Sequence, residues 1–74
     1  MSLDAKLLAA HAAGDKDRLV TLYTQAAASA DDPDAAGFYL THAYVFALEA
    51  GLPQAADLRA QLVEMGREEP LQSV

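Results

Sequence analysis

The sequence predicts an all-α fold of four antiparallel helices, arranged as two helical hairpins. Alanine, the residue with the strongest intrinsic helix preference, is abundant among the 74 residues, and the few glycines and prolines sit mainly at expected helix ends. Apolar residues also recur every three or four positions, which is the spacing of one helix face. A chain of this length forms a single domain with a small core, so we expect one helical domain over residues 1–74.

The first helix is expected over about residues 3–13. Ser2 is placed to cap its first turn, and Gly14 is placed to end it in the left-handed conformation. Its predicted apolar stripe comprises Leu3, Leu7 and Ala10, widened by Leu8.

The second helix is expected over about residues 16–30, with Asp15 as its N-cap. The connection between the two helices is so short that they should run antiparallel, as a first hairpin over about residues 3–30. The predicted stripe of this helix comprises Leu19, Leu22, Tyr23, Ala26 and Ala30.

The third helix is the most apolar segment of the chain. Asp32 as N-cap and Pro33 at the first helical position predict its start, and it should continue to Ala50. Residues 38–50 are apolar around most of the helix circumference, so this helix needs cover from other helices or from a second copy of the chain. The run is too short to span a membrane.

Gly51 should end the third helix, and Pro53 should open a fourth that runs to about Met65. These two helices form a second hairpin over about residues 33–66, followed by a frayed tail over residues 67–74. The predicted stripe of the fourth helix comprises Ala55, Leu58, Leu62 and Met65. The predicted core of the domain comprises Leu7, Leu19, Leu22, Tyr23, Leu40, Ala43, Tyr44, Ala47, Leu58 and Leu62.

The two halves resemble each other when one is shifted by 37 residues along the other. The shift aligns Leu3 with Leu40 and Gly14 with Gly51, and a period of this length is typical of helical solenoid repeats. Further pairs at this shift are Leu7 with Tyr44, Leu8 with Val45, Ala10 with Ala47 and Ala13 with Ala50.

On these residues the chain resembles the tetratricopeptide repeat (TPR) family over about residues 2–66. The matching positions are Leu40, Ala43, Tyr44, Gly51 and Ala56 in the second unit, and Leu3, Leu7, Gly14, Asp15, Tyr23 and Ala26 in the first. The chain departs from the family pattern at Thr41, Leu19 and Ala60, where glycine, a small residue and an aromatic residue are usual. The resemblance implies two TPR-like hairpins that bind a partner protein or peptide without catalysis.

The charge of the chain argues against nucleic acid and anionic membranes as partners. Five Lys and Arg stand against eleven Asp and Glu, for a formal net charge of −6. Binding to phosphate backbones or anionic lipids depends on clustered basic residues. The chain has no cysteine and no charged-then-apolar leader, and we expect it in the cytoplasm.

One face of the third helix is the candidate partner-binding site, formed by Phe38, His42, Val45 and Glu49. Its apolar residues could anchor a partner while His42 bonds to it. The alternative is a small ligand-binding protein or enzyme with a pocket at His42 and Glu49. We expect no catalytic residue, because no nucleophile or second acid is patterned with His42.

The remaining polar residues are explained by structural roles rather than by metal binding or catalysis. His11 suits the negative end of a helix dipole, and no histidine spacing typical of metal sites occurs. Asp31, Asp32 and Asp34 lack the glutamate that closes a calcium loop, so we interpret them as helix-capping acids. No phosphate loop or nucleotide-binding motif is present, so neither a metal nor a cofactor is expected. The three tyrosines, Tyr23, Tyr39 and Tyr44, are expected in the core with their hydroxyls at its rim.

The third helix also predicts self-association, because the other helices cannot bury all of its apolar residues. Phe38, Val45 and either Phe46 or Leu48 cannot all be hidden by neighbouring helices that are rich in alanine. Apolar surface left exposed on a small domain is often an interface, and two-fold dimers are the commonest closed assembly. We therefore expect a homodimer, with a foreign partner helix on the same surface as the alternative.

Overall fold

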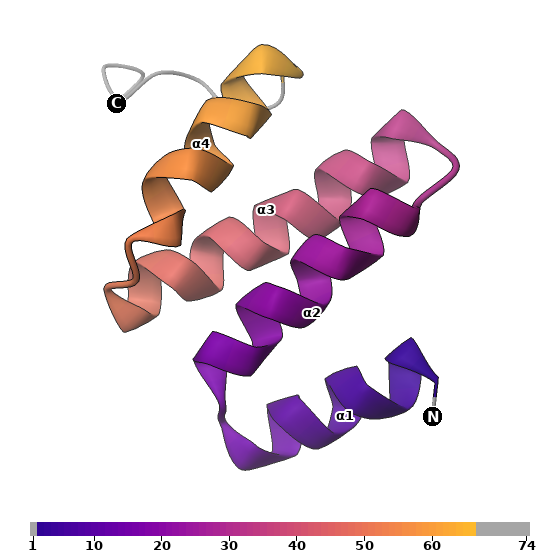
Figure 1. Ribbon diagram of the computed structural model, residues 1–74, viewed down its shortest axis with the longest axis vertical. Coiled ribbons are helices and arrows are strands. Elements are labelled where there is room, and N and C mark those ends of the chain that lie inside the picture. The colour runs from indigo at the N-terminus through magenta and orange to yellow at the C-terminus, as the bar shows by residue number, and fades with distance from the viewer. Residues whose placement is uncertain (1, 67–74) are drawn as a thin grey trace.

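The computed structural model describes residues 2–66 and confirms the all-α class. Its four helices are α1 (Leu3–Ala13), α2 (Lys16–Ser29), α3 (Pro33–Ala50) and α4 (Gln54–Glu64) (Figure 1). Each end lies within a residue or two of its predicted position. The tail predicted to be frayed, residues 67–74, lies outside the described residues. No helix within residues 2–66 is long and apolar enough to cross a membrane.

The helix ends are set by short-range hydrogen bonds, as the sequence predicts. The side chain of Ser2 accepts from the Ala5 amide at 3.1 Å, and that of Asp15 accepts from the Arg18 amide at 3.2 Å. Asp32 accepts from the Asp34 amide at 3.2 Å, with Pro33 at the first helical position of α3. No side-chain cap of this kind bonds to the first turn of α4, which Pro53 precedes.

The four helices pack in sequence order, each against its neighbours along the chain. The most extensive contact is between α2 and α3, which run side by side and antiparallel (Figure 1). α1 and α2 diverge from the turn that joins them, as do α3 and α4 (Figure 1). Gly14 ends α1 and Gly51 ends α3 at these turns. Backbone contacts therefore join α1 to α2 and α4 to α3, and the α2–α3 pair is the centre of the molecule.

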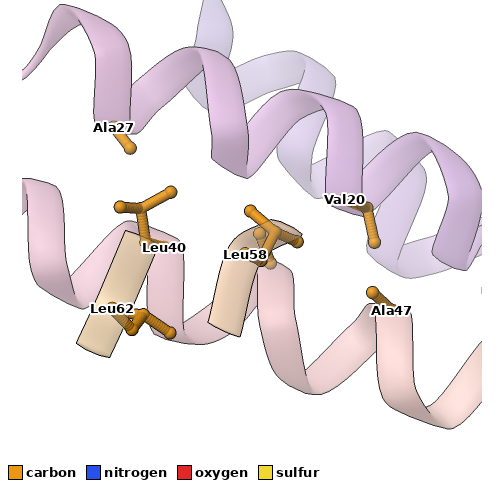
Figure 2. Packing of buried hydrophobic residues seen from close by; sticks show 7 residues of the cluster. Val20, Ala27, Leu40, Ala47, Leu58 and Leu62 are labelled. Carbon is orange, nitrogen blue, oxygen red and sulfur yellow. The ribbon is translucent and has the colours of Figure 1, made fainter. Parts of the chain in front are cut away.

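The main core lies where α4 meets the α2–α3 pair. Figure 2 shows Leu58 between Ala27 and Leu40 on one side and Val20 and Ala47 on the other. Leu62, from the next turn of α4, is fully buried. The small side chains at this seam let α2 and α3 approach closely, and the leucines of α4 fill the remaining space.

A second, smaller core joins α1 to the other side of α2. Its buried residues are Ala10, Leu19 and Leu22, and the half-buried Leu3, Leu7, Tyr23 and Phe46 pack against it. Tyr23 and Phe46 also border the main core, so these two rings connect both clusters.

The predicted core differs from the observed one at its edges. Leu7, Tyr23 and Tyr44 are half-buried rather than buried, and Leu8, expected to widen the α1 stripe, is 71% exposed. Leu8 is exposed because, within residues 2–66, α1 has close backbone contacts only with α2, so its far side faces solvent. Four buried hydrophobic residues were not in the predicted core: Ala10, Val20, Ala26 and Ala27.

Candidate interaction surface

Three large apolar side chains of α3 point away from both cores. Phe38 is 58% exposed, Val45 is 42% exposed and Leu48 is 55% exposed. They lie on one side of the helix because Val45 and Leu48 follow Phe38 by roughly two and three turns. Thr41, also exposed, lies between them on the same side. We call Phe38, Thr41, Val45 and Leu48 the α3 surface.

The α3 surface carries no charged side chain. Between Asp34 and Glu49 the helix contains no Asp, Glu, Lys or Arg. Glu49, a predicted member of the site, pairs through Oε1 with Nζ of Lys16 at 3.3 Å, and both side chains are about half exposed. Glu49 therefore lies at the end of the α3 surface, and its carboxylate faces the start of α2.

His42 lies at the edge of the α3 surface and is half-buried. Its Nδ1 is 2.9 Å from the carbonyl oxygen of Phe38, which can only accept, so Nδ1 carries the proton. The imidazole stacks on the ring of Tyr23 at a centroid distance of 5.1 Å and also contacts Phe38 at 4.3 Å. These contacts hold the ring against the protein.

The predicted alternative, a pocket built on His42 and Glu49, would require these two groups to act together. In the described part of the chain, no hydrogen bond or ion pair joins them, since His42 bonds to its own helix and Glu49 to Lys16. The four predicted site residues thus share a helix face, but their polar groups are engaged separately.

A shallow hollow of about 180 Å³ opens on this side of α3. It is lined by Thr41, His42, Val45 and Phe46. Thr41 and Val45 belong to one row of side chains spaced four residues apart, and His42 and Phe46 belong to the adjacent row. The hollow is therefore a groove between two ridges of the helix surface.

Aromatic rings support the groove from behind. Phe46 stacks on Tyr23 at a centroid distance of 5.9 Å, and His11 of α1 meets the same Phe46 edge-on at 5.6 Å. Tyr39 lies 6.3 Å from Tyr23 on the other side. Three helices thus contribute rings to one cluster, which fixes the wall of the groove that His42 and Phe46 form.

Two further hollows are open and lie between neighbouring helices. One of about 510 Å³ runs between α1 and α2 and is lined by groups of both signs, among them Lys6, Asp15 and Arg18. Another of about 320 Å³ lies between α3 and α4, where Tyr44, Leu48 and Arg59 line it. Within residues 2–66 no group of three histidine or acidic side chains could hold a metal ion.

The sequence prediction of the site did not include Thr41 and Leu48. Leu48 was one of two candidates for the uncovered residue, and the structure resolves the choice. Phe46 packs against both cores, whereas Leu48 remains exposed. Phe46 is the covered residue because α1 and α2 lie on its side of α3. Helical periodicity alone does not show on which side these helices lie.

Comparison of the chain with protein-family models, with curated proteins and with solved structures found no significant match.

Proposed function

We propose that this protein is a non-enzymatic protein–protein interaction module, and that the α3 surface receives its partner. The observation that carries this proposal is the exposure of Phe38, Val45 and Leu48 together on one side of a helix that has no charged residue between Asp34 and Glu49. A chain with eleven acidic residues in 74 has ample polar residues to cover that face, yet apolar ones occupy it. Contiguous apolar surface on a small domain is typical of binding sites.

The proposal includes a TPR-like relationship between the two halves, and the helix ends support it. The amide of Asp15 donates to the carbonyl of Ala10 at 3.1 Å, and that of Leu52 donates to Ala47 at 2.9 Å. Both turns place a glycine in the left-handed conformation, with φ of 66° at Gly14 and 67° at Gly51. The same C-terminal cap thus recurs at the 37-residue shift.

The polar groups near the α3 surface also favour binding over catalysis. Nδ1 of His42 is bonded to a backbone carbonyl, and the carboxylate of Glu49 faces a lysine. Because no hydrogen bond or ion pair within residues 2–66 joins these two groups, they do not form the acid–base pair that the alternative function would use. We propose no cofactor, and the cytoplasm stays the compartment expected from the sequence.

Photo-crosslinking in the source cell tests the proposal. A benzophenone amino acid replaces Phe38 on the α3 surface, and a matched variant carries it at Leu8, which is more exposed but lies on α1. We expect discrete crosslinked products from position 38 that are absent from position 8. Adding Val45→Glu to the first variant should abolish them, because a charge then occupies the apolar face.

Circular dichroism of each purified variant first establishes that it is folded. Identical products from both positions, or none from position 38, would show that the α3 surface is not a specific binding site.

A further inference from the structure

We infer that the partner received by the α3 surface is the α3 helix of a second copy of this chain, related to the first by a two-fold axis. This inference rests on the proposed function and specifies the partner. Three properties of the surface support it: its shape, its charge and its extent.

The shape of the α3 surface fits another helix. The hollow lined by Thr41, His42, Val45 and Phe46 separates two rows of side chains, and each row follows a four-residue spacing. Helices pack when the ridges of one enter the grooves of the other. A groove between rows of four-residue spacing accepts a ridge of the same spacing, and the two helices then cross at about −50°.

Two identical helices can share this class of packing symmetrically. Both helices use the same kind of ridge and the same kind of groove. A two-fold interface requires that the same patch serve on both subunits. On α3, the row of Thr41 and Val45 supplies the ridge, and the groove beside it receives the matching row of the second copy.

The charge distribution favours a second copy over a charged partner. Two chains with a net charge of −6 repel each other, so they can associate only where few acidic groups meet. The α3 surface satisfies this condition because it lacks charged residues and because Lys16 lies 3.3 Å from the carboxylate of Glu49 at its end. A basic partner would instead favour the acidic surfaces elsewhere.

The extent of the surface predicts a weak dimer. From Phe38 to Leu48 the helix rises by roughly 15 Å, so the contact is small compared with a standard protein interface. Interfaces at the low end of the size range form transient complexes. We therefore expect association at concentrations of about 10–500 μM, with fast exchange between monomer and dimer.

Sedimentation over this concentration range is the first test. The average mass of the unmodified chain should rise from 7.8 kDa towards twice that value. A variant with Phe38→Glu and Val45→Glu should remain a helical monomer, since paired charges would face each other across the axis. Leu8→Glu, on the exposed side of α1, should dimerise like the unmodified chain.

A conservative second test covers the case in which the double variant fails to fold. The chain has no cysteine, so a single Val45→Cys introduces the only thiol. Near a two-fold axis, this residue meets its own counterpart closely enough for a disulfide. We expect mild oxidation to link Val45→Cys chains at least about tenfold faster than Leu8→Cys chains.

The outcomes separate this inference from the proposed function. A constant mass of 7.8 kDa, or equal disulfide rates at the two positions, overturns the second copy as the partner. If the benzophenone at position 38 then captures a foreign protein, the interaction module stands and only its partner is different. If it captures nothing, both proposals fail.

Discussion

His11 and Tyr23 join α1 to α2 through a hydrogen bond of 3.0 Å between Nε2 of the imidazole and the phenolic oxygen. Their rings also meet edge-on, with centroids 5.9 Å apart. α1 has close backbone contacts with α2 but with no other helix in the described part of the chain. This pair and the neighbouring ring of Phe46 therefore add to the second core in holding the first helix in place.

The first prediction concerns this hydrogen bond. Tyr23→Phe retains the ring and its stacking but removes the hydroxyl, so it should lower the free energy of unfolding by about 0.5–1.5 kcal/mol. In a double-mutant cycle with His11→Ala, urea denaturation should give a coupling free energy of about 0.5–1 kcal/mol. Tyr39→Phe, which changes a half-buried tyrosine on α3, is the control and should cost less. A coupling energy near zero would mean that the bond adds nothing to the stability of α1.

The second prediction concerns the core at α4. Leu62 is fully buried whereas Val63, the next residue, is 38% exposed. Leu62→Ala should destabilise the protein by about 2–5 kcal/mol, because it removes apolar contacts and leaves a cavity. A domain of this size has little more stability than that, so the variant should be largely unfolded at 37 °C. Val63→Ala should change the free energy of unfolding by less than about 1 kcal/mol. Equal effects at the two positions would contradict the packing of α4.

The third prediction concerns the two turns that end α1 and α3. A Cβ at Gly14 or Gly51 would meet no atom within 4 Å, so a substitution there tests the backbone conformation alone. Gly51→Ala and Gly14→Ala should each cost about 1 kcal/mol, because a residue with a side chain resists the left-handed conformation. Gly51→Asn should cost less, since asparagine tolerates this conformation better. Thermal unfolding of the three variants measures these differences, and similar losses at the two glycines would agree with the equivalence of the turns.

The helix ends could be predicted from the sequence because their causes are local. Ser2, Asp15 and Asp32 each bond to an amide two or three residues further along, and Gly14 and Gly51 adopt the conformation that glycine allows. No information about distant parts of the chain is needed for either effect.

The faces of α2 could not be predicted in the same way, because this helix is covered on two sides. Leu19 and Leu22 face α1, whereas Val20 and Ala27 face α3 and α4, and Tyr23 lies between the two groups. A search for one apolar stripe finds the first group and leaves Val20 out of the predicted core. The α3 surface has the same ambiguity, since periodicity shows that α3 is apolar around most of its circumference but not which side its neighbours leave open.

The last prediction compares two valines that lie in different environments. Val20 is 2% exposed in the main core, and Val45 is 42% exposed on the α3 surface. Val20→Thr keeps the side-chain volume but places a hydroxyl in the core, which should cost about 1–3 kcal/mol. Part of this cost can be offset, because Thr24 and Thr41 already donate to the carbonyl four residues earlier, at 2.7 and 2.8 Å. Val45→Thr should change the free energy of unfolding of the monomer by less than about 0.5 kcal/mol.

The same valine variants link stability to association. At dilutions where the chain is monomeric, urea denaturation should separate Val20→Thr from Val45→Thr by at least about 1 kcal/mol. At high concentration, sedimentation should show the larger effect for the other variant. Val45→Thr should weaken the dimer because its hydroxyl lies in the apolar contact, and Val20→Thr should leave the dimer unchanged while the protein stays folded. If Val45→Thr instead destabilised the monomer as much as Val20→Thr, Val45 would be part of the core and the α3 surface would be covered by the chain itself.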